Sequence, residues 1–178
     1  DYEVLTDDAG RRLIAFGRFA GMVGAHNGIM TYGQRSGRFQ LKRMKDCLDY
    51  AEARELYKQL ELPAMKVVLT GTGRVGMGSR EVLLDMGLHE VAPAEFLAKD
   101  FDQPVFTQLH CQDYVERKGD HLFDKEEFYT QPERYQSIFS PYTRVADVMI
   151  NGIYWDNKAP AFFTHKEMRQ PDWSIQVI

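Results

Sequence analysis

The sequence has little cysteine and no long apolar run, and both absences exclude classes of protein. Only two of its 178 residues are cysteine, Cys47 and Cys111, and they lie far apart without metal-ligand spacing. A small secreted scaffold held by disulfides is therefore excluded, and a reducing cytoplasm is the predicted location. No stretch reaches the roughly 18 uninterrupted apolar residues of a membrane span, and the amino terminus lacks a signal-peptide pattern. We expect no membrane partner.

Positive charge is not in excess either. The chain carries 22 Lys and Arg against 26 Asp and Glu, a net charge of −4. No general positive field exists to hold a phosphate backbone, so nucleic acid is not a predicted partner. With 44% hydrophobic and 27% charged residues, the chain has the composition of one globular domain, or of one domain with an appendage. It opens at Asp1 and ends on the apolar run 174–178, and we expect an excerpt of a longer protein.

Residues 1–62 are predicted to form a connecting segment of a short hairpin and helices. Turn residues at 7–10 separate two apolar pairs and predict two short strands within residues 1–13. Helical spacing of apolar residues follows over 12–32, and helix formers dominate 39–60 up to Leu62-Pro63, where proline ends the helix. The first of these helices also carries a stripe of residues without side chains along one face, made of Gly17, Gly21, Gly24 and Gly28. Because such a stripe allows close packing at a domain or subunit contact, it predicts a homo-oligomer through this helix.

Residues 63–178 show strands alternating with helices. The β-branched run 65–70 precedes a glycine cluster and then a helix that carries Val82, Leu83 and Met86. This alternation predicts the α/β class, as a Rossmann-like, doubly wound parallel sheet with helices on both faces and a helical connecting segment before it. Further strands are predicted at 89–93, 105–109, 145–150 and 173–178, with one short helix at 164–169.

The main chemical signal is a G-x-G-x-x-G loop between the strand at 65–70 and its following helix. The loop reads Gly71-Thr72-Gly73-Arg74-Val75-Gly76. Its first glycine permits a sharp turn, its second lets the backbone approach a pyrophosphate, and its third lets helix and strand pack closely. Amide donors and the positive helix end then point at the phosphates. These six residues are predicted to bind a dinucleotide, NAD or NADP.

Two further groups of residues are predicted around the dinucleotide. An acidic residue at the end of the second strand usually accepts from the ribose, and Glu95 occupies that spacing with Glu90 as its rival. Arg74 could instead meet a 2′-phosphate, so the choice between NAD and NADP stays open. On the nicotinamide side, the segment after the strand at 145–150 offers Gly152, Ile153 and Tyr154. No histidine shows metal-ligand spacing, and no metal is predicted.

Four stretches of the chain together resemble a known enzyme group. They are Asp1–Leu5 with Gly10–Gly17 and Ala20-Gly21, the loop Thr70–Gly73, the run Pro132–Thr143, and Ile150–Trp155 with Ala159-Pro160. In these residues the chain resembles the lysine-ketoglutarate reductase and lysine-forming saccharopine dehydrogenase group, within the alanine dehydrogenase and transhydrogenase superfamily. The resemblance covers most of the chain.

The resemblance implies a reductive condensation. A nicotinamide cofactor would deliver hydride to the imine between lysine and 2-oxoglutarate, giving saccharopine, or would take part in the reverse oxidation of this small-molecule substrate. Residues 63–178 would be the dinucleotide-binding domain, and Glu3, Arg12 and Phe16 would face the substrate. The proton-transfer residues of the group belong to an amino-terminal domain before Asp1, so the catalytic residues are unknown here. The chain alone is expected to bind dinucleotide and to catalyse nothing.

Two alternatives stay open. The pattern Lys158-Ala-Pro-Ala-Phe-Phe-Thr164 also occurs in the superfamily of alanine dehydrogenase, which makes that enzyme the second candidate. A non-catalytic dinucleotide sensor would keep the glycine loop and couple it to a partner. The length of the region 97–142 resembles the ketoglutarate reductases more than the compact fungal saccharopine dehydrogenases, and the direction of the reaction is not fixed by the sequence.

Overall fold

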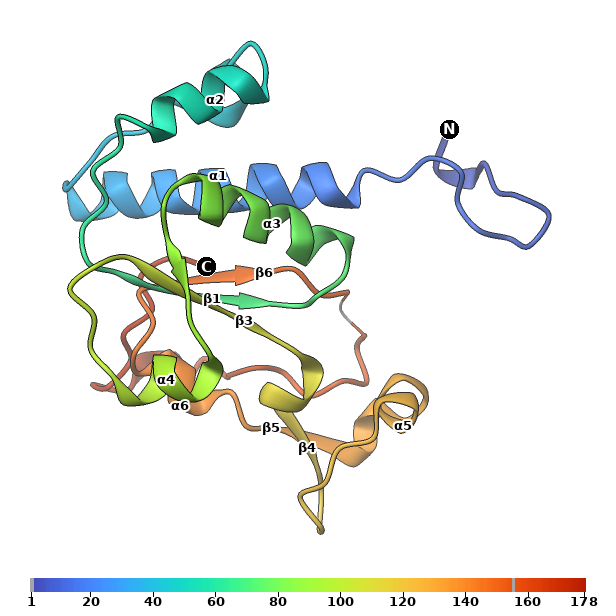
Figure 1. The fold of residues 1–178 in the computed structure, drawn as a ribbon. Coiled ribbons are helices and arrows are strands. Elements are labelled where there is room, and N and C mark those ends of the chain that lie inside the picture. Colours follow the sequence, from blue (N-terminus) through green and yellow to red (C-terminus); the bar gives the residue numbers. More distant parts are fainter. Residues whose placement is uncertain (1, 155) are drawn as a thin grey trace.

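The computed structural model describes residues 2–154 and 156–178 and contains one parallel sheet between two layers of helices (Figure 1). The α-helices are α1 (Gly17–Ser36), α2 (Tyr50–Tyr57), α3 (Arg74–Asp85), α4 (Pro93–Ala98), α5 (Lys125–Thr130) and α6 (Ser140–Thr143). The strands are β1 (Lys66–Thr70), β2 (His89–Glu90), β3 (Val105–Leu109), β4 (Val115–Arg117), β5 (Tyr135–Ser137) and β6 (Val148–Asn151). Short 3-10 helices occupy Tyr2–Val4, Met44–Asp46, Cys111–Asp113, Pro132–Arg134 and Glu167–Arg169.

The main sheet has four strands in the order β2-β3-β1-β6, and all its pairings are parallel. From β1 the chain goes first to the β3 side and returns later to β6 on the other side. The order therefore reverses next to β1, and in an open α/β sheet ligands bind at such a point, beyond the carboxyl ends of the strands. Strands β4 and β5 form a separate antiparallel pair between β3 and β6 in sequence.

Alternate residues of the strands bury against opposite layers of helices. Val67 and Leu69 of β1 pack with α1 and α3, whereas Val68 packs in a second core with α4 and α6. Both faces are apolar, which suits a parallel sheet that helices cover on each side. Figure 1 shows α1 and α3 on one side of the sheet and α4 and α6 on the other. The predicted α/β class with a doubly wound parallel sheet is confirmed. Among the described helices, none combines the length and apolar character that crossing a membrane requires.

The amino-terminal arm differs from its prediction. Instead of two strands it forms a single antiparallel bridge between Thr6 and Arg12, closed by a hydrogen bond from Leu13 N to Leu5 O (2.9 Å). Because residues 12–13 are used in this hairpin, the first helix begins at Gly17 and not at residue 12. The arm extends from the body of the molecule at the start of α1 (Figure 1).

The predicted helix over 39–60 is also shorter in the structure. Phe39 packs onto Gly33, and the Lys42 carbonyl accepts a hydrogen bond from buried His26, so this stretch is held away from helical geometry. Asp49 then caps α2 by accepting from Glu52 N (2.9 Å). Only residues 44–46 and 50–57 of the predicted range are helical.

Three elements in the second half of the chain are shorter in the structure than the sequence predicts. The strand at 89–93 stops at Glu90, because Pro93 begins α4. The carboxyl-terminal run 173–178 makes one bridge, Val148 to Val177, while Ser174 N donates to the carbonyl of Thr143 at the end of α6 and Gln176 N donates to the carbonyl of Asp147. The helix expected at 164–169 is a 3-10 turn at 167–169.

Part of the glycine stripe of α1 packs inside the chain. A Cβ at Gly21 would lie 1.9 Å from the Val75 carbonyl oxygen, and a Cβ at Gly78 of α3 would lie 2.0 Å from the Arg18 carbonyl oxygen. The two helices therefore cross with their backbones in contact, and Ser79 Oγ donates to Gly21 O (3.0 Å). Gly21 thus supports the start of α3 and is not available to a partner subunit, whereas Gly24 is exposed, and the homo-oligomer through this helix stays a prediction. The division at residue 62 stays a proposal, although α1 shares its core with β1 and β6.

We expect opposite effects from two alanine substitutions in α1. Gly21→Ala should lower the free energy of unfolding by about 3 kcal/mol, because its Cβ would collide with a backbone carbonyl. Gly24→Ala should raise it by about 0.5–1 kcal/mol, since no atom that the structure describes lies within 4 Å of that Cβ and alanine is the better helix former. Urea unfolding of both variants measures the difference; equal effects would contradict the described α1–α3 contact.

A buried histidine of α1 bonds to α2 and to the segment between α1 and α2. His26 is fully buried, with Nε2 2.6 Å from the Lys42 carbonyl oxygen and Nδ1 2.6 Å from the Tyr57 hydroxyl. A carbonyl can only accept, so Nε2 carries the proton and the neutral ring accepts from Tyr57 at Nδ1. Burial lowers the pKa of His26 below 6.5, its ordinary value.

This lowered pKa predicts a pH-dependent stability. The His26 contribution is fully present above pH 6.5, where the unfolded chain is also neutral at this residue, and is lost as the pH falls through the folded pKa. His26→Phe should lower the free energy of unfolding by about 2 kcal/mol at pH 7.5, because the Tyr57 hydroxyl and the Lys42 carbonyl each lose a hydrogen-bond partner. Thermal unfolding at pH 7.5 and pH 5 should show the gap between the two proteins narrowing at the lower pH. A constant or widening gap would contradict this assignment.

Candidate functional site

The glycine loop turns from β1 into α3 at the point where the strand order reverses. Gly71 follows β1 with a φ of +91°, a conformation that glycine adopts without strain, and its N–H donates to Leu109 O (3.0 Å). Gly73 precedes α3 as its N-cap, without a side-chain cap, and Met77 N donates to Gly73 O (2.8 Å). The first amides of the helix therefore have no side-chain partner from the cap and point out of its positive end.

Three glycines meet at the base of this loop. A Cβ at Gly76 would lie 2.0 Å from the Gly71 carbonyl oxygen, and a Cβ at Gly71 would lie 2.8 Å from the Gly152 carbonyl oxygen. Gly152 N donates to Thr70 O (2.9 Å), which places the end of β6 against the loop. Any larger residue at these positions would separate β1, α3 and β6.

Gly73 differs from these three because it faces open space. Among the described residues, no heavy atom outside its chain neighbours lies within 4 Å of a Cβ built there, and its φ of −78° is available to any residue. The fold itself therefore does not require a glycine at this position. A group that approaches the backbone closely from outside does require one, which is the role of the second glycine in a dinucleotide loop.

A cavity of about 380 Å³ opens over Gly71, Thr72 and Gly73. One wall belongs to the segment after β6, which contributes Gly152, Ile153 and Tyr154. The opposite wall comes from residues 111–137, which we call the appendage and which contain β4, α5 and β5 (Figure 1). Its lining residues are Cys111, Tyr114, Phe128, Tyr129 and Pro132. The cavity therefore has amide donors at its base and mainly apolar walls, with Asp156 as a charged lining residue, and small-ligand sites usually combine apolar walls with a few polar groups.

The two walls also contact each other. Tyr114 and Phe162 stack edge to face with ring centroids 5.0 Å apart, and Ser137 Oγ donates to Phe162 O (2.9 Å). Tyr114 donates its hydroxyl hydrogen bond to Cys111 Sγ (3.2 Å), and burial raises the pKa of Tyr114 above its usual range. Tyr114 thus links the appendage to the segment around Phe162 by ring packing.

The structure brings together most of the residues that the sequence predicts around a dinucleotide. Gly71, Thr72, Gly73, Gly152, Ile153 and Tyr154 all line the one cavity. Arg74 and Val75 begin α3 beside it, and Gly17 of α1 packs on Arg74, where its Cβ would lie 3.2 Å from the Arg74 Cβ. Gly76 lies beneath the loop and not in the cavity wall.

The predicted placement of Glu95 at a strand end is wrong. Glu95 lies in α4 and pairs with Lys99 (2.8 Å), because the second strand is only two residues long and Pro93 begins a helix. Moreover, β2 is the edge strand, and β3 takes the position next to β1. The rival, Glu90, forms a two-pronged pair with Arg80, whose Nη2 lies 2.6 Å from Glu90 Oε2.

A second hollow lies beyond the ends of β2 and β3, on the other side of the loop. Its lining includes Glu90, Gln108, His110 and Asp113. Gln108 Nε2 donates to the Gly71 carbonyl (2.9 Å), and the Asp113 carboxylate accepts from His110 N (2.7 Å). Both carboxylates bordering this hollow are thus already engaged by groups of the chain.

The residues assigned to substrate by the resemblance belong to the amino-terminal arm. Phe16 is 55% exposed and meets Tyr2 edge to face, with ring centroids 6.4 Å apart. It directly precedes Gly17, which touches Arg74, so the end of the arm lies beside the glycine loop. Arg12 pairs with Thr6 through the backbone. The Glu3 side chain lies outside the part of the chain that the structure describes.

Sequence reasoning did not identify the appendage wall. Its lining residues show no motif, since they lie in short elements separated by up to some twenty positions and face the cavity only after β4 and β5 pair. The Lys158-Ala-Pro pattern gave a signal, and Ala159 and Pro160 do line the cavity. Over residues 2–154 and 156–178, no three His, Cys, Asp or Glu side chains gather in a way that could hold a metal ion.

Comparison with known proteins identifies relatives along nearly the whole chain. No protein-family model matches it. The chain is 30% identical to the mitochondrial alpha-aminoadipic semialdehyde synthase of Mus musculus over 94% of its length, and 30% identical to alpha-aminoadipic semialdehyde synthase of Arabidopsis thaliana over 95%. The mitochondrial enzyme of Bos taurus is 28% identical over 94%. The chain spans only about a fifth of these relatives, 20%, 19% and 20% of their respective lengths.

Proposed function

We propose that the chain, which resembles the lysine-ketoglutarate reductase and saccharopine dehydrogenase group and is 30% identical to two alpha-aminoadipic semialdehyde synthases, is the NAD(P)-binding portion of an enzyme that forms or oxidises saccharopine. The observation that carries this proposal is Gly73, whose bare backbone faces open space at the N-terminus of α3 and the base of an apolar cavity. A close-packed turn without a ligand would not need that space.

The residues of the loop fit the parts of a dinucleotide. The amides that follow Gly73 would hold the pyrophosphate, and Thr72 lies beside them on the cavity floor. Gly152, Ile153 and Tyr154 would receive the nicotinamide half, because they follow β6 on one side of the loop. The hollow at β2 and β3 would receive the adenosine half on the other side. Arg74 is exposed near the loop, and whether it meets a 2′-phosphate decides between NAD and NADP.

The chemistry supplied by a bound nicotinamide is hydride transfer to or from a carbon that bears nitrogen. The chain's own contribution is to orient the cofactor and to exclude water from one side of it with apolar walls. The arm would bring Arg12 and Phe16 toward a small-molecule amino-acid or oxo-acid substrate, with Glu3 beside them. Arginine suits such a role because it binds a carboxylate with two parallel hydrogen bonds. The proton-transfer residues would come from another part of the full-length enzyme, so we propose that this chain alone does not turn over.

The cellular compartment remains a proposal. The sequence predicts the cytoplasm, whereas the relatives from Mus musculus and Bos taurus are named as mitochondrial. Residues 1–62 and 63–178 are likewise proposed as connecting segment and dinucleotide domain.

Calorimetric titration of the chain with NAD⁺, NADH, NADP⁺ and NADPH tests this proposal. We expect saturable binding of at least one dinucleotide, and a loss of more than tenfold in affinity for Gly73→Leu, because its side chain would occupy the place of the pyrophosphate. Gly73→Leu should still fold, since its backbone geometry and surroundings accept a side chain.

Gly24→Ala is the matched control, as it also fills open space at a glycine but lies outside the loop, within α1. It should bind like the unchanged protein. No binding of any of the four dinucleotides, or equal binding by the Gly73→Leu variant, would contradict the proposal.

A further inference from the structure

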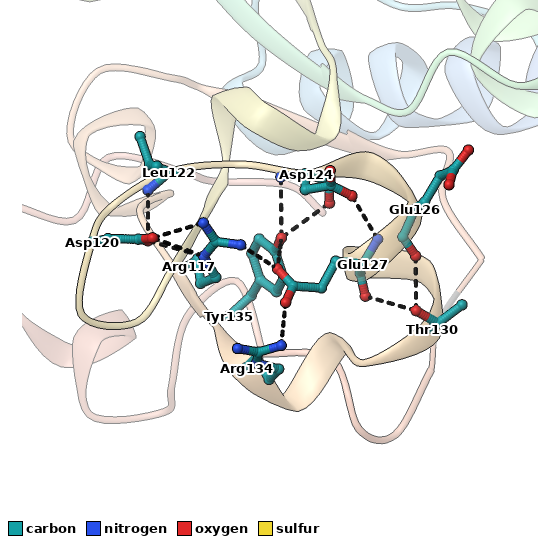
Figure 2. A network of polar contacts seen from close by, with 9 residues as sticks. All are labelled: Arg117, Asp120, Leu122, Asp124, Glu126, Glu127, Thr130, Arg134 and Tyr135. Atoms are coloured by element: carbon teal, nitrogen blue, oxygen red, sulfur yellow. Dashed lines mark hydrogen bonds and ion pairs between the residues drawn. The ribbon is translucent and has the colours of Figure 1, made fainter.

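One polar cluster of the appendage contributes to the cavity without lining it. Its centre is Glu127 of α5, whose side chain is only 15% exposed although it carries charge. Figure 2 shows this carboxylate between two arginines and a tyrosine. Such a partly buried charge with several partners fixes geometry more strongly than a single surface pair does.

Each partner of Glu127 comes from a different part of the appendage. Arg117 of β4 donates from Nη1 to Oε2 (2.7 Å), and the Tyr135 hydroxyl of β5 donates to the same oxygen (2.9 Å). Arg134, just before β5, forms an ion pair with Oε1. The hydrogen bonds from Arg117 and Tyr135 lower the pKa of Glu127, so the carboxylate is charged at neutral pH. One side chain thus fixes α5 to both strands of the hairpin.

The residues that follow Glu127 in the sequence form the cavity wall. Phe128 is 8% exposed, and its ring lies 5.1 Å from the ring of Tyr135 by centroid. Phe128, Tyr129 and Pro132 all line the cavity opposite Ile153. Since α5 has only six residues, it cannot hold its own orientation and depends on its contacts with β4 and β5.

We infer that Glu127 is a positioning residue for the nicotinamide half of the dinucleotide. By fixing α5 on the β4–β5 hairpin, its carboxylate sets the place of Phe128, Tyr129 and Pro132 against Ile153, and so the width of the cavity into which the nicotinamide enters. The inference rests on the proposed function. It does not extend to the adenosine half, because no appendage residue after Asp113 lines the hollow at β2 and β3.

The test separates the two halves of the ligand. Titrations of Glu127→Gln with NADH and ADP-ribose, or with NADPH and 2′-phospho-ADP-ribose if that dinucleotide binds more tightly, compare ligands with and without the nicotinamide. We expect affinity for the full dinucleotide to fall about tenfold and affinity for the fragment to change by less than about twofold. General damage to the fold would weaken both ligands alike.

Glu116→Gln is the matched control. Glu116 lies on β4 with a similarly covered side chain, 20% exposed, and accepts from His121 and Gln136 (both 2.7 Å) without a described bond to α5. This variant should bind both ligands as the unchanged protein does. Arg134→Gln provides a second test if Glu127→Gln folds poorly, because it removes one exposed partner of Glu127. It should lower the affinity for the full dinucleotide, by a smaller factor, and leave the affinity for the fragment unchanged.

Unchanged dinucleotide affinity in the folded Glu127→Gln and Arg134→Gln variants, or equal loss of both ligands, would overturn the inference. Failure of the unchanged protein to bind either ligand would instead refute the proposed function.

Discussion

The arrangement depends on backbone contacts that only glycine allows. Gly71, Gly76 and Gly152 bring β1, α3 and β6 together at their ends, and Gly21 and Gly78 bring α1 and α3 into contact behind them. A methyl group at Gly21, Gly76 or Gly78 would lie about 2 Å from a carbonyl oxygen. The N-terminus of α3 is therefore positioned by steric fit from two directions, and a ligand there would meet amides that need no rearrangement. In this framework Gly73 stands apart as the loop glycine that the fold does not use.

The two sides of the loop are built from different kinds of interaction. The side facing β2 and β3 is polar, and its carboxylates Glu90 and Asp113 already bond to other groups of the chain. The side facing β6 is mainly apolar. It lies between the segment that follows β6 and the appendage. A dinucleotide that lies across the loop would place its polar adenosine half on the first side and its flat nicotinamide ring on the second. This distribution follows from the strand order, because β6 returns to the far side of β1.

The sequence predicts the features that depend on neighbouring residues better than those that depend on contacts between distant residues. The strand at 66–70, the glycine loop and β3 follow from local patterns, which predict them nearly residue by residue. The same patterns predict a helix after the loop, without its bounds. The placement of Glu95 failed because the usual rule assumes that the second strand pairs with the first, whereas here β3 does. The prediction of one helix over 39–60 is wrong because the tertiary contacts of Phe39 and of the Lys42 carbonyl outweigh the local helix propensity. The aromatic wall could not be predicted at all, because Tyr114 and Tyr129 become neighbours only after the hairpin pairs.

The appendage explains why a charged residue would be placed behind the wall of a mainly apolar cavity. Residues 111–137 are too few to bury an independent core, and the aromatic packing around α5 centres on Phe123, Phe128 and Tyr135. Non-directional packing of three rings fixes distances poorly, whereas a carboxylate with partners on both strands fixes a direction as well. Burying such a group contributes little net stability. Its value lies in the orientation of α5, and hence in the shape of the cavity above the glycine loop.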